Sequence, residues 1–292
     1  MELKKGFYTA LGTPLDDNGN LVAESLKKHV EQQIEYGASG LLLMGSMGIE
    51  AYLKLSTFAE AVKVGAAANN GRLPLFVGCM DTSIAKVMEK ISLIGDAKID
   101  GVVLTTPFYG KMDDAEIVNF FRTIADRSPF PVFLYDLAYV TQNKITLSII
   151  DKLIDHPNIV GMKSVDWQLL QHIGRKYPEK NFQCLYSGLD TFDYANMMGI
   201  TKNLDGMFTC TPKNGRKLYD AIYAGDFKKA RVHLDNILLL RDTMFEHGLM
   251  WCFTHAMNLL GFEGKFHEDY CVPITDEAKN IIKNTMIKIG EL

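Results

Sequence analysis

Short apolar segments recur along the chain, roughly every 25 to 35 residues, and each has the length of a single β-strand. Between them, apolar positions return every three or four residues, which is typical of amphipathic helices. The eight apolar segments lie at residues 6–11, 40–45, 74–79, 101–107, 131–136, 159–164, 182–188 and 206–211. We therefore predict eight strands that alternate with helices.

The helical stretches begin with residues that favour helix N-termini. Ser56 is suited to the N-cap of a helix over 56–68, and acidic residues open the stretch 114–127. Two further helices are predicted at 21–36 and 83–94. Strands that alternate with helices pair in parallel through crossover helices. Eight such units in about 210 residues favour a (β/α)8 TIM barrel over a doubly wound sheet. No GxGxxG motif follows the first strand, which argues against a dinucleotide-binding fold.

The chain continues beyond the eighth predicted strand with further helical patterns. These lie at residues 216–224, 226–245, 250–260 and 276–289. We therefore expect a barrel domain in residues 1–215, followed by a barrel-closing helix and a C-terminal helical extension in residues 216–292.

Composition narrows the class of protein. The chain has 292 residues, 47% hydrophobic and 23% charged, with a net charge of -4. This charge does not favour a nucleic acid or an anionic membrane as a partner. No apolar stretch approaches the roughly 20 residues that span a bilayer, and no signal-peptide region precedes the first strand. The 5 cysteines form no CxxC pair, so we expect reduced thiols and a cytoplasmic protein.

Lys163 stands near the end of the apolar run 158–164 and is the most informative residue in this pattern. Desolvating an ammonium group costs free energy, so a buried lysine needs a neutralising partner or has a chemical role. A neutral amine can attack a carbonyl carbon and form a Schiff base. A lysine just beyond the strand, in solvent, is the alternative, and this segment alone leaves both open.

The predicted barrel places its active site at the C-terminal ends of the strands. Those ends carry one lysine, several hydroxyl side chains, two tyrosines and several glycines, within residues 13–14, 45–48, 81, 105–109, 135–136, 163–164, 187–190 and 209–211. Such a set suits the binding of a small oxyanion and proton transfer around a carbonyl group.

Five motifs at these strand ends follow one another in a distinctive order. They are Gly45-Ser46-Met47-Gly48, Thr106-Pro107-Phe108-Tyr109, Tyr135-Asp136-Leu137-Ala138, Gly161-Met162-Lys163 and Ser187-Gly188-Leu189-Asp190. Their order and spacing resemble the dihydrodipicolinate synthase / N-acetylneuraminate lyase family of pyruvate-dependent class I aldolases. The resemblance extends over nearly the whole chain, from residues 12–14 to residues 273–276.

The resemblance implies a role for each matching residue. Lys163 takes the position of the lysine that forms a Schiff base with pyruvate or another 2-oxo acid, and Tyr135 that of the tyrosine that assists proton transfer. The turn that ends with Gly48 would hold the pyruvate carboxylate, and Ser46 would join the proton relay. Tyr109 would reach into the site of a neighbouring subunit. The family commonly forms homotetramers that are dimers of dimers.

Departures from the family pattern bear on the substrate. Met47 replaces a second hydroxyl in the carboxylate turn, and Ile49 replaces an acidic residue, with Glu50 one place later. Val140 stands where the synthases carry an arginine that grips the carboxylate of the second substrate. The loss of a bidentate arginine argues against aspartate semialdehyde as the acceptor.

Three acidic residues favour a polyhydroxylated substrate. Asp136 replaces a usual asparagine, and Asp166 lies near a position that often holds threonine. Asp190 follows Gly188 and matches a residue that contacts sugar hydroxyls in the lyases. We expect these residues, together with Met47, Gly48 and Gly188, to bind substrate.

Structural explanations remain open for the same residues. Tyr135 is compatible with a filler of the barrel core, and Tyr109 with an interface aromatic. Ser46 and Asp190 are each compatible with a cap of the helix that follows.

The leading hypothesis is a Schiff-base aldolase or lyase that acts between pyruvate and an aldehyde, on a 2-keto-3-deoxy sugar acid or a sialic-acid-like substrate. A dihydrodipicolinate synthase-like or hydratase-aldolase enzyme, and an inactive barrel that binds a 2-oxo acid, are the alternatives. The lysine would supply the activation itself, so no cofactor is expected. Cys252 and His255 lie one helical turn apart without a second ligand pair, so no metal site is expected either.

Overall fold

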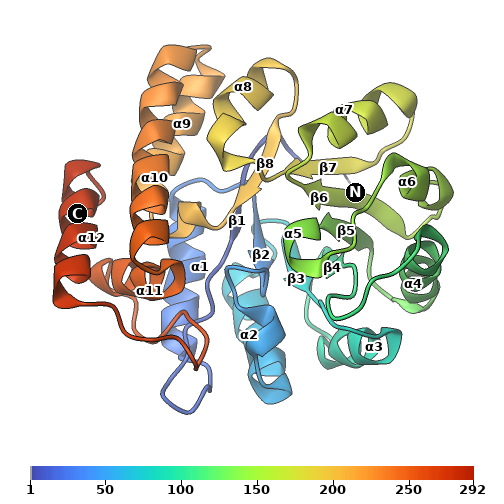
Figure 1. Ribbon diagram of the computed structural model, residues 1–292, viewed down its shortest axis with the longest axis horizontal. Coiled ribbons are helices and arrows are strands. Elements are labelled where there is room, and N and C mark those ends of the chain that lie inside the picture. Colours follow the sequence, from blue (N-terminus) through green and yellow to red (C-terminus); the bar gives the residue numbers. More distant parts are fainter. Residues whose placement is uncertain (1) are drawn as a thin grey trace.

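Eight parallel strands close into a barrel in the order in which they follow along the chain. The computed structural model describes residues 2–292, and Figure 1 shows the strands at its centre with helices around them. The strands are β1 (Gly6–Ala10), β2 (Gly40–Leu43), β3 (Leu75–Gly78), β4 (Gly101–Thr105), β5 (Val132–Asp136), β6 (Ile159–Ser164), β7 (Gln183–Tyr186) and β8 (Lys202–Asp205). Because β8 also pairs with β1, the barrel is closed, and the predicted (β/α)8 fold is confirmed.

Helices follow the strands and surround the barrel. They are α1 (Ala23–Glu35), α2 (Leu55–Asn69), α3 (Ile84–Leu93), α4 (Asp114–Arg127), α6 (Leu147–Leu153), α7 (Trp167–Lys176), α8 (Phe192–Met197) and α9 (Pro212–Tyr223). Shorter pieces at the strand ends are η1 (Glu50–Tyr52), α5 (Ala138–Thr141), η2 (Leu189–Thr191) and η3 (Met207–Thr209). The predicted helices at 21–36, 56–68, 83–94 and 114–127 correspond to α1, α2, α3 and α4.

Helix starts follow the expected chemistry in one case and depart from it in another. Asp113 and Glu116 form a capping box at the start of α4, so both satisfy backbone N–H groups that the helix leaves free. The N-cap of α2 is Lys54, and Ser56 lies inside the first turn. The prediction that Ser56 caps this helix is therefore wrong.

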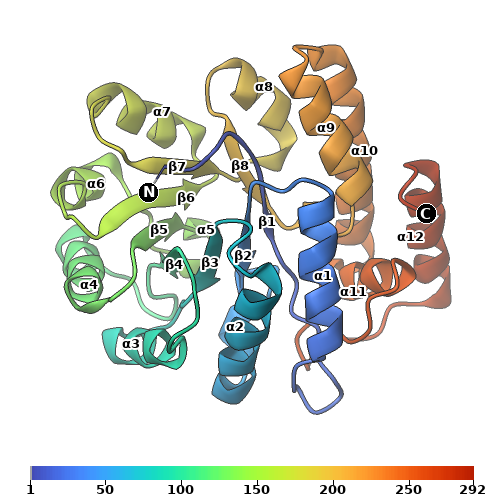
Figure 2. The ribbon, with the colours of Figure 1, turned by 180° about the vertical axis from the view of Figure 1, so that it is seen from behind.

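Three helices after α9 pack together on one side of the barrel, as Figures 1 and 2 show from opposite directions. They are α10 (Phe227–His247), α11 (Leu249–Leu259) and α12 (Asp276–Lys288). The buried carboxylate of Glu291 accepts hydrogen bonds from the backbone N–H groups of Asn214 (2.8 Å) and Lys213 (3.1 Å). These bonds attach the C-terminal end of the chain to the first turn of α9.

The eighth strand lies a few residues earlier than the apolar pattern predicts. The segment 206–211 contains the turn η3, and the strand is the more polar Lys202–Asp205. Its buried Asn203 accepts hydrogen bonds from Tyr219 (2.5 Å) and Asn196 (2.6 Å) on the surrounding helices. A buried polar side chain is stable in this strand because side chains of the neighbouring helices satisfy its hydrogen-bonding groups. A search for apolar segments does not detect a strand of this kind.

The interior of the barrel is filled by large side chains from most of its strands. Tyr8, Phe76, Phe133, Leu185 and Leu204 are among the buried residues that pack there. On β6, a side chain at Gly161 would come within 2.6 Å of the Phe133 ring, so the glycine makes room for it. The packed interior leaves space for chemistry only at the ends of the strands.

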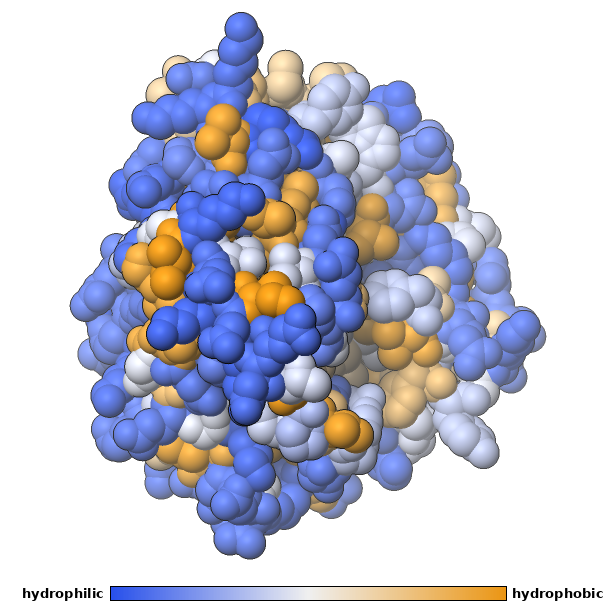
Figure 3. All heavy atoms as spheres, turned by 60° about the vertical axis from the view of Figure 1, so that its left-hand side comes forward, coloured by the Kyte–Doolittle hydropathy of each residue, from blue (hydrophilic) through white to orange (hydrophobic). Residues whose placement is uncertain are grey.

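The surface over the C-terminal helices is mainly hydrophilic, with hydrophobic side chains in small separate groups (Figure 3). Within residues 2–292, every helix is too short or too polar to cross a lipid bilayer.

Candidate active site

Thr105, Tyr135 and Lys163 lie side by side in one layer at the C-terminal ends of three adjacent strands. In the parallel register, Thr105 of β4 is opposite Tyr135 of β5, which is opposite Lys163 of β6. All three are buried, and Lys163 is only 6% exposed. Its Nζ lies 4.1 Å from the centroid of the Tyr135 ring. The lysine is therefore inside the barrel mouth, which excludes the alternative of a lysine in solvent beyond the strand.

The charge of the Lys163 ammonium is compensated by two neighbours. A cation over an aromatic face gains about 2 kcal/mol or more when both groups are desolvated, and the Tyr135 ring supplies this contact. Asp205, at the end of β8, also interacts electrostatically with the lysine. Burial raises the pKa of the Asp205 carboxyl, while the backbone N–H of Met207 and the charge of Lys163 oppose that rise.

Sequence analysis missed Asp205 because it placed the eighth strand at residues 206–211, whereas the strand is Lys202–Asp205 and ends at this residue. A strand that ends at Asp205 puts this carboxyl at the same end of the barrel as Lys163. The correct position of the strand end would have identified this carboxyl in the sequence.

The turn after β2 is fixed tightly and brings its middle residues to the barrel mouth. Met44 and Ile49 adopt left-handed backbone conformations, with φ of 52° and 49°. A side chain at Gly48 would lie 2.8 Å from the Met44 backbone and 2.9 Å from the carbonyl oxygen of Leu11, so only glycine fits. Thr13 donates a hydrogen bond of 2.7 Å to the Gly48 carbonyl.

Ser46 and Met47 point in different directions from this turn. Ser46 is exposed at the mouth. Met47 is half-buried, and a Cβ added to Gly206 would come within 2.7 Å of its side chain. Met47 therefore extends toward the residue after β8, close to Asp205.

A cavity of about 280 Å³ opens at the mouth, beside the layer that contains Lys163. Its walls include four hydroxyl side chains, two carboxyl groups and several apolar residues: Ser46, Tyr52, Thr105, Thr141, Glu50, Glu268, Ile49, Ala51, Met80, Phe108, Leu137 and Val140. Met80 and Leu137 also pack in the interior cluster that contains Tyr135, so the cavity adjoins the layer of Thr105, Tyr135 and Lys163. We refer to this space as the mouth cavity.

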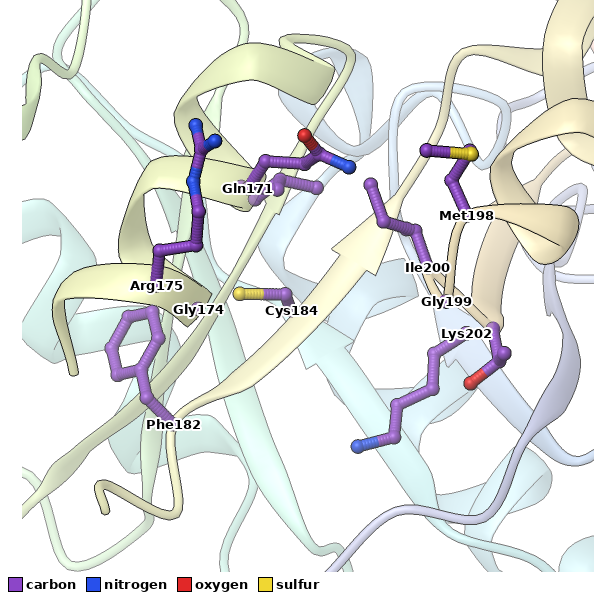
Figure 4. A pocket seen from close by; sticks show the side chains of 11 residues that line it. Gln171, Gly174, Arg175, Phe182, Cys184, Met198, Gly199, Ile200 and Lys202 are labelled. Carbon is purple, nitrogen blue, oxygen red and sulfur yellow. The ribbon is translucent and has the colours of Figure 1, made fainter. Parts of the chain in front are cut away.

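A second cavity, of about 370 Å³, lies on the outer wall between α7 and the segment that leads into β8 (Figure 4). Arg175 and Lys202 lie at its two ends, with Cys184 between them. Lys202 is the first residue of β8, so this cavity is at the end of the barrel opposite to Lys163. The mouth cavity, unlike this one, therefore lies at the same end of the barrel as Lys163.

Tyr109 and Val140 lie toward the outside of the mouth. The Tyr109 side chain is 92% exposed in the single chain, on the loop between β4 and α4. Val140 is 51% exposed and lines the mouth cavity from α5. The exposed ring of Tyr109 is free to contact another molecule, as an aromatic at an interface would be.

Asp136 and Asp166 are held by a common cation. Both carboxylates pair with Lys144, and Asp136 also accepts hydrogen bonds from the Ser164 hydroxyl (2.8 Å) and the Ile145 N–H (3.2 Å). Asp166 caps α7 through the N–H of Leu169. These contacts stabilise the loops after β5 and β6, which favours a structural role over the substrate contact that the sequence suggested.

Asp190, in η2 after β7, is also paired. It forms two hydrogen bonds with Arg241 of α10, at 2.6 and 2.8 Å, and these hydrogen bonds lower the pKa of its carboxyl. Gly188 lies against Tyr186, whose hydroxyl would be 2.1 Å from a Cβ at that position. Asp190 does not cap α8, because this helix has no side-chain hydrogen bond at its N-cap.

No cluster suited to a metal ion appears in the described part of the chain, where no three His, Cys, Asp or Glu side chains converge.

Comparison with known proteins agrees with this geometry. The model of the "Dihydrodipicolinate synthetase family" matches residues 3–289. A 4-hydroxy-tetrahydrodipicolinate synthase from Acidiphilium cryptum is 25% identical over 98% of this chain and 99% of its own length. The dihydrodipicolinate synthase structure from Bacteroides thetaiotaomicron has a TM-score of 0.90 at 22% identity, covering 99% of this chain and 100% of that one.

A third similar structure contains a ligand. It is that of a prophage protein of the dihydrodipicolinic acid synthase family from E. coli K12 in complex with pyruvate, with a TM-score of 0.88 at 20% identity and 99% coverage of both chains. At this identity the structural likeness shows the fold.

Fold and site together define an enzyme of the (β/α)8 class with a buried lysine at its mouth. The chain belongs to the dihydrodipicolinate synthetase family. It is a pyruvate-dependent carbon–carbon lyase of the class I aldolase type.

Proposed function

We propose that Lys163 forms a Schiff base with a 2-oxo acid and that the enzyme cleaves or forms a carbon–carbon bond between pyruvate and an aldehyde. The observation that carries this proposal is the burial of Lys163 against the Tyr135 ring at the C-terminal end of β6. Burial of a lysine ammonium costs free energy, and Lys163 is buried beside the Asp205 carboxyl and against an aromatic ring that carries a proton donor.

The reaction follows from the chemistry of an amine beside a phenol. The neutral amine of Lys163 adds to the C2 carbonyl, and loss of water gives an iminium ion. The iminium accepts the electron pair of the C3–C4 bond as this bond breaks, which leaves an enamine of pyruvate. Tyr135 removes the proton of the C4 hydroxyl, so the aldehyde can leave, and Ser46 and Tyr109 relay that proton. The lysine supplies the electrophilic activation, so the proposed reaction uses no metal or organic cofactor.

The turn after β2 is the proposed carboxylate site. Its backbone N–H groups at Met47 and Gly48 would hold the pyruvate carboxylate, and Gly188 would form the opposite wall. Met47 replaces a hydroxyl donor, and a hydrogen bond of about 1.5–3 kcal/mol to a charged group is lost with it.

A polyhydroxylated substrate fits the proposed site better than a dicarboxylate. The mouth cavity has hydroxyl and carboxyl groups in its wall, and Val140 stands where the synthases carry arginine. A 2-keto-3-deoxy sugar acid or a sialic-acid-like compound is therefore the proposed substrate. Asp136, Asp166 and Asp190 remain candidates for substrate contact only if their partners Lys144 and Arg241 release them.

The names of the relatives favour one alternative, dihydrodipicolinate synthase activity or a related hydratase-aldolase reaction on another 2-oxo acid. A barrel that binds a 2-oxo acid without turnover is the other alternative, motivated by Met47, Ile49 and Val140. Retention of Lys163 and Tyr135 in contact argues against it, because packing alone does not require either polar group.

The proposed assembly is a cytoplasmic homotetramer, a dimer of dimers in which Tyr109 completes a neighbour's site. The exposure of the Tyr109 ring supports this assembly, since a large exposed aromatic is typical of an interface or pocket wall. Residues 1–215 would form the catalytic barrel, and residues 216–292 the closing helix and the extension.

Borohydride reduction in the presence of pyruvate tests the proposal. We expect a mass gain that peptide mapping locates on Lys163. Lys202, the lysine of β8 at the other end of the barrel, is the internal control and should stay unmodified. The absence of an adduct with pyruvate or any other 2-oxo acid would contradict the Schiff-base assignment.

A further inference from the structure

Two residues in the wall of the mouth cavity each have a buried polar atom that lacks a partner within the described chain. Across residues 2–292, neither the hydroxyl of Thr105 nor the Oε2 atom of Glu50 finds a hydrogen-bond partner, although both atoms are shielded from bulk solvent. Thr105 is 2% exposed and Glu50 is 1% exposed. Leaving a buried polar atom unpaired costs about 1–3 kcal/mol, so two such atoms beside one cavity indicate a ligand that satisfies them.

Glu50 is held in place by one of its two oxygens. Its Oε1 accepts a hydrogen bond of 2.6 Å from Lys90, which is itself only 6% exposed. The same ammonium donates to the Met80 carbonyl at 2.7 Å and pairs with Asp81 at 3.0 Å. An ammonium group has three donors, and these three acceptors use all of them. Lys90 therefore fixes Glu50 but has no donor left for a substrate, and Oε2 has no partner among residues 2–292.

The protonation chemistry of Glu50 suits a neutral hydroxyl group. Burial raises the pKa of this carboxyl to about 8, with the charge of Lys90 partly opposing the rise. Near neutral pH the group therefore has both proton-accepting and proton-donating forms available. A substrate carboxylate gains nothing here, because it meets a carboxyl group and a cation that is already fully paired.

Thr105 connects this carboxyl to the reacting centre. It is the register partner of Tyr135, which is the partner of Lys163, and it lines the same cavity as Glu50. A chain that extends from the bond broken beside Tyr135 would pass Thr105 first and then reach Glu50. The volume of about 280 Å³ is near the lower end of small-molecule pockets, which suits a short aldehyde chain.

We infer that Thr105 and Glu50 form a subsite that binds hydroxyl groups of the aldehyde portion of the substrate. This inference rests on the proposed Schiff-base function and extends it to the choice of aldehyde. The subsite selects a hydroxylated, uncharged aldehyde chain over an alkyl or a carboxylated one. Lys90 is the positioning residue that holds Glu50 for this contact.

The test compares two aldehydes of equal length in condensation with pyruvate. Glyceraldehyde has two hydroxyl groups, and propanal has none. We expect the wild-type enzyme to prefer glyceraldehyde in kcat/KM, and Thr105→Val and Glu50→Gln each to reduce that preference by about 10- to 100-fold, the range for a lost hydrogen bond to a buried polar group. Activity with propanal should change much less than activity with glyceraldehyde.

Thr105→Val keeps the inference testable if Glu50→Gln disturbs the buried ion pair with Lys90. Valine has nearly the shape of threonine, and the Thr105 hydroxyl has no partner to lose in the described chain. Thr141→Val is the matched comparison, because the Thr141 hydroxyl lines the same cavity but is already bonded to Thr106 at 2.8 Å. It should change the ratio between the two aldehydes less than Thr105→Val does.

The outcomes separate this inference from the proposed function. If wild-type enzyme forms the pyruvate adduct but shows no preference for glyceraldehyde, or if Thr105→Val leaves the preference unchanged, the subsite is wrong while the Schiff-base function stands. If no pyruvate adduct forms at Lys163, the proposed function fails and the subsite fails with it.

Discussion

The Nζ atom of Lys163 lies 4.1 Å from the centroid of the Tyr135 ring, and the two residues are partners in the register of β5 and β6. The pairing of β5 and β6 places the two residues side by side, so the amine and the aromatic ring need no loop rearrangement to meet. Preorganised groups of this kind contribute to catalysis because the protein holds them in position before the substrate arrives.

Replacing Lys163 should abolish turnover without unfolding the barrel. Lys163→Ala removes the amine that forms the Schiff base, and we expect no carbon–carbon bond chemistry and no borohydride-trapped adduct. Lys202→Ala, at the opposite end of the barrel, should retain the adduct. Steady-state kinetics and mass spectrometry measure both effects, with circular dichroism to verify folding. More than a trace of turnover in Lys163→Ala would show that another group carries the reaction.

Removing the Tyr135 hydroxyl should slow the reaction, but the variant should still form the imine at least in part. We expect Tyr135→Phe to lower kcat by roughly 10²–10⁴-fold, the usual contribution of a general acid–base group. Tyr8→Phe is the matched control, since Tyr8 is the other large tyrosine of the interior cluster and donates its hydroxyl to the Lys4 carbonyl at 2.7 Å. An unchanged kcat in Tyr135→Phe would mean that Tyr135 only fills the barrel core.

The barrel and the burial of Lys163 at its mouth were predictable because they depend on pattern and chain order. Alternating apolar segments define strands and helices, and Lys163 interrupts one of the clearest of them. The eighth strand was misplaced because it contains the polar residue Asn203. Tyr219 and Asn196, on the surrounding helices, satisfy this side chain, and an apolar pattern does not show such contacts.

The finer parts of the site depend on contacts between separate segments, and the sequence does not reveal these. Asp136 and Asp166 were expected to bind substrate, but both pair with Lys144. Thr105 and Glu50 look ordinary in the sequence, and only the three-dimensional packing shows that each has a buried atom without a partner in the described chain.

Aspartate semialdehyde should be a poor acceptor for this enzyme. Val140 lines the mouth cavity and cannot grip a carboxylate, and a site that lacks a required polar contact can discriminate by up to about 10⁴–10⁵. We expect condensation of pyruvate with aspartate semialdehyde to be absent or very weak, and Val140→Arg to increase it. A coupled reductase assay measures this product. Robust activity of the wild-type protein would mean that another residue binds the carboxylate.

Activity should depend on assembly if Tyr109 completes a neighbouring site. Its side chain is 92% exposed in the single chain, so its own barrel does not hold the ring in place. We expect a homotetramer whose specific activity falls when dilution dissociates it, and a further loss in Tyr109→Phe. Light scattering and activity on the same dilution series are the measurement. A fully active monomer would remove Tyr109 from the proton relay.

Acid should destabilise the protein through His29, which is fully buried in α1 between Phe262 and Phe266. Burial lowers the pKa of His29 from 6.5 to about 3, with the backbone of Gly12 partly opposing the shift. Between these two pH values the unfolded chain binds a proton that the folded protein does not, so stability falls as the pH drops below 6.5. From pH 6.5 to pH 5 this group alone should remove about 2 kcal/mol from the free energy of unfolding, at about 1.36 kcal/mol per pH unit.

His29→Leu removes the titration, so its urea unfolding midpoint should shift less over the same pH interval. Equal shifts in the wild type and the variant would show that His29 is protonated inside the folded protein and that the buried site tolerates the charge.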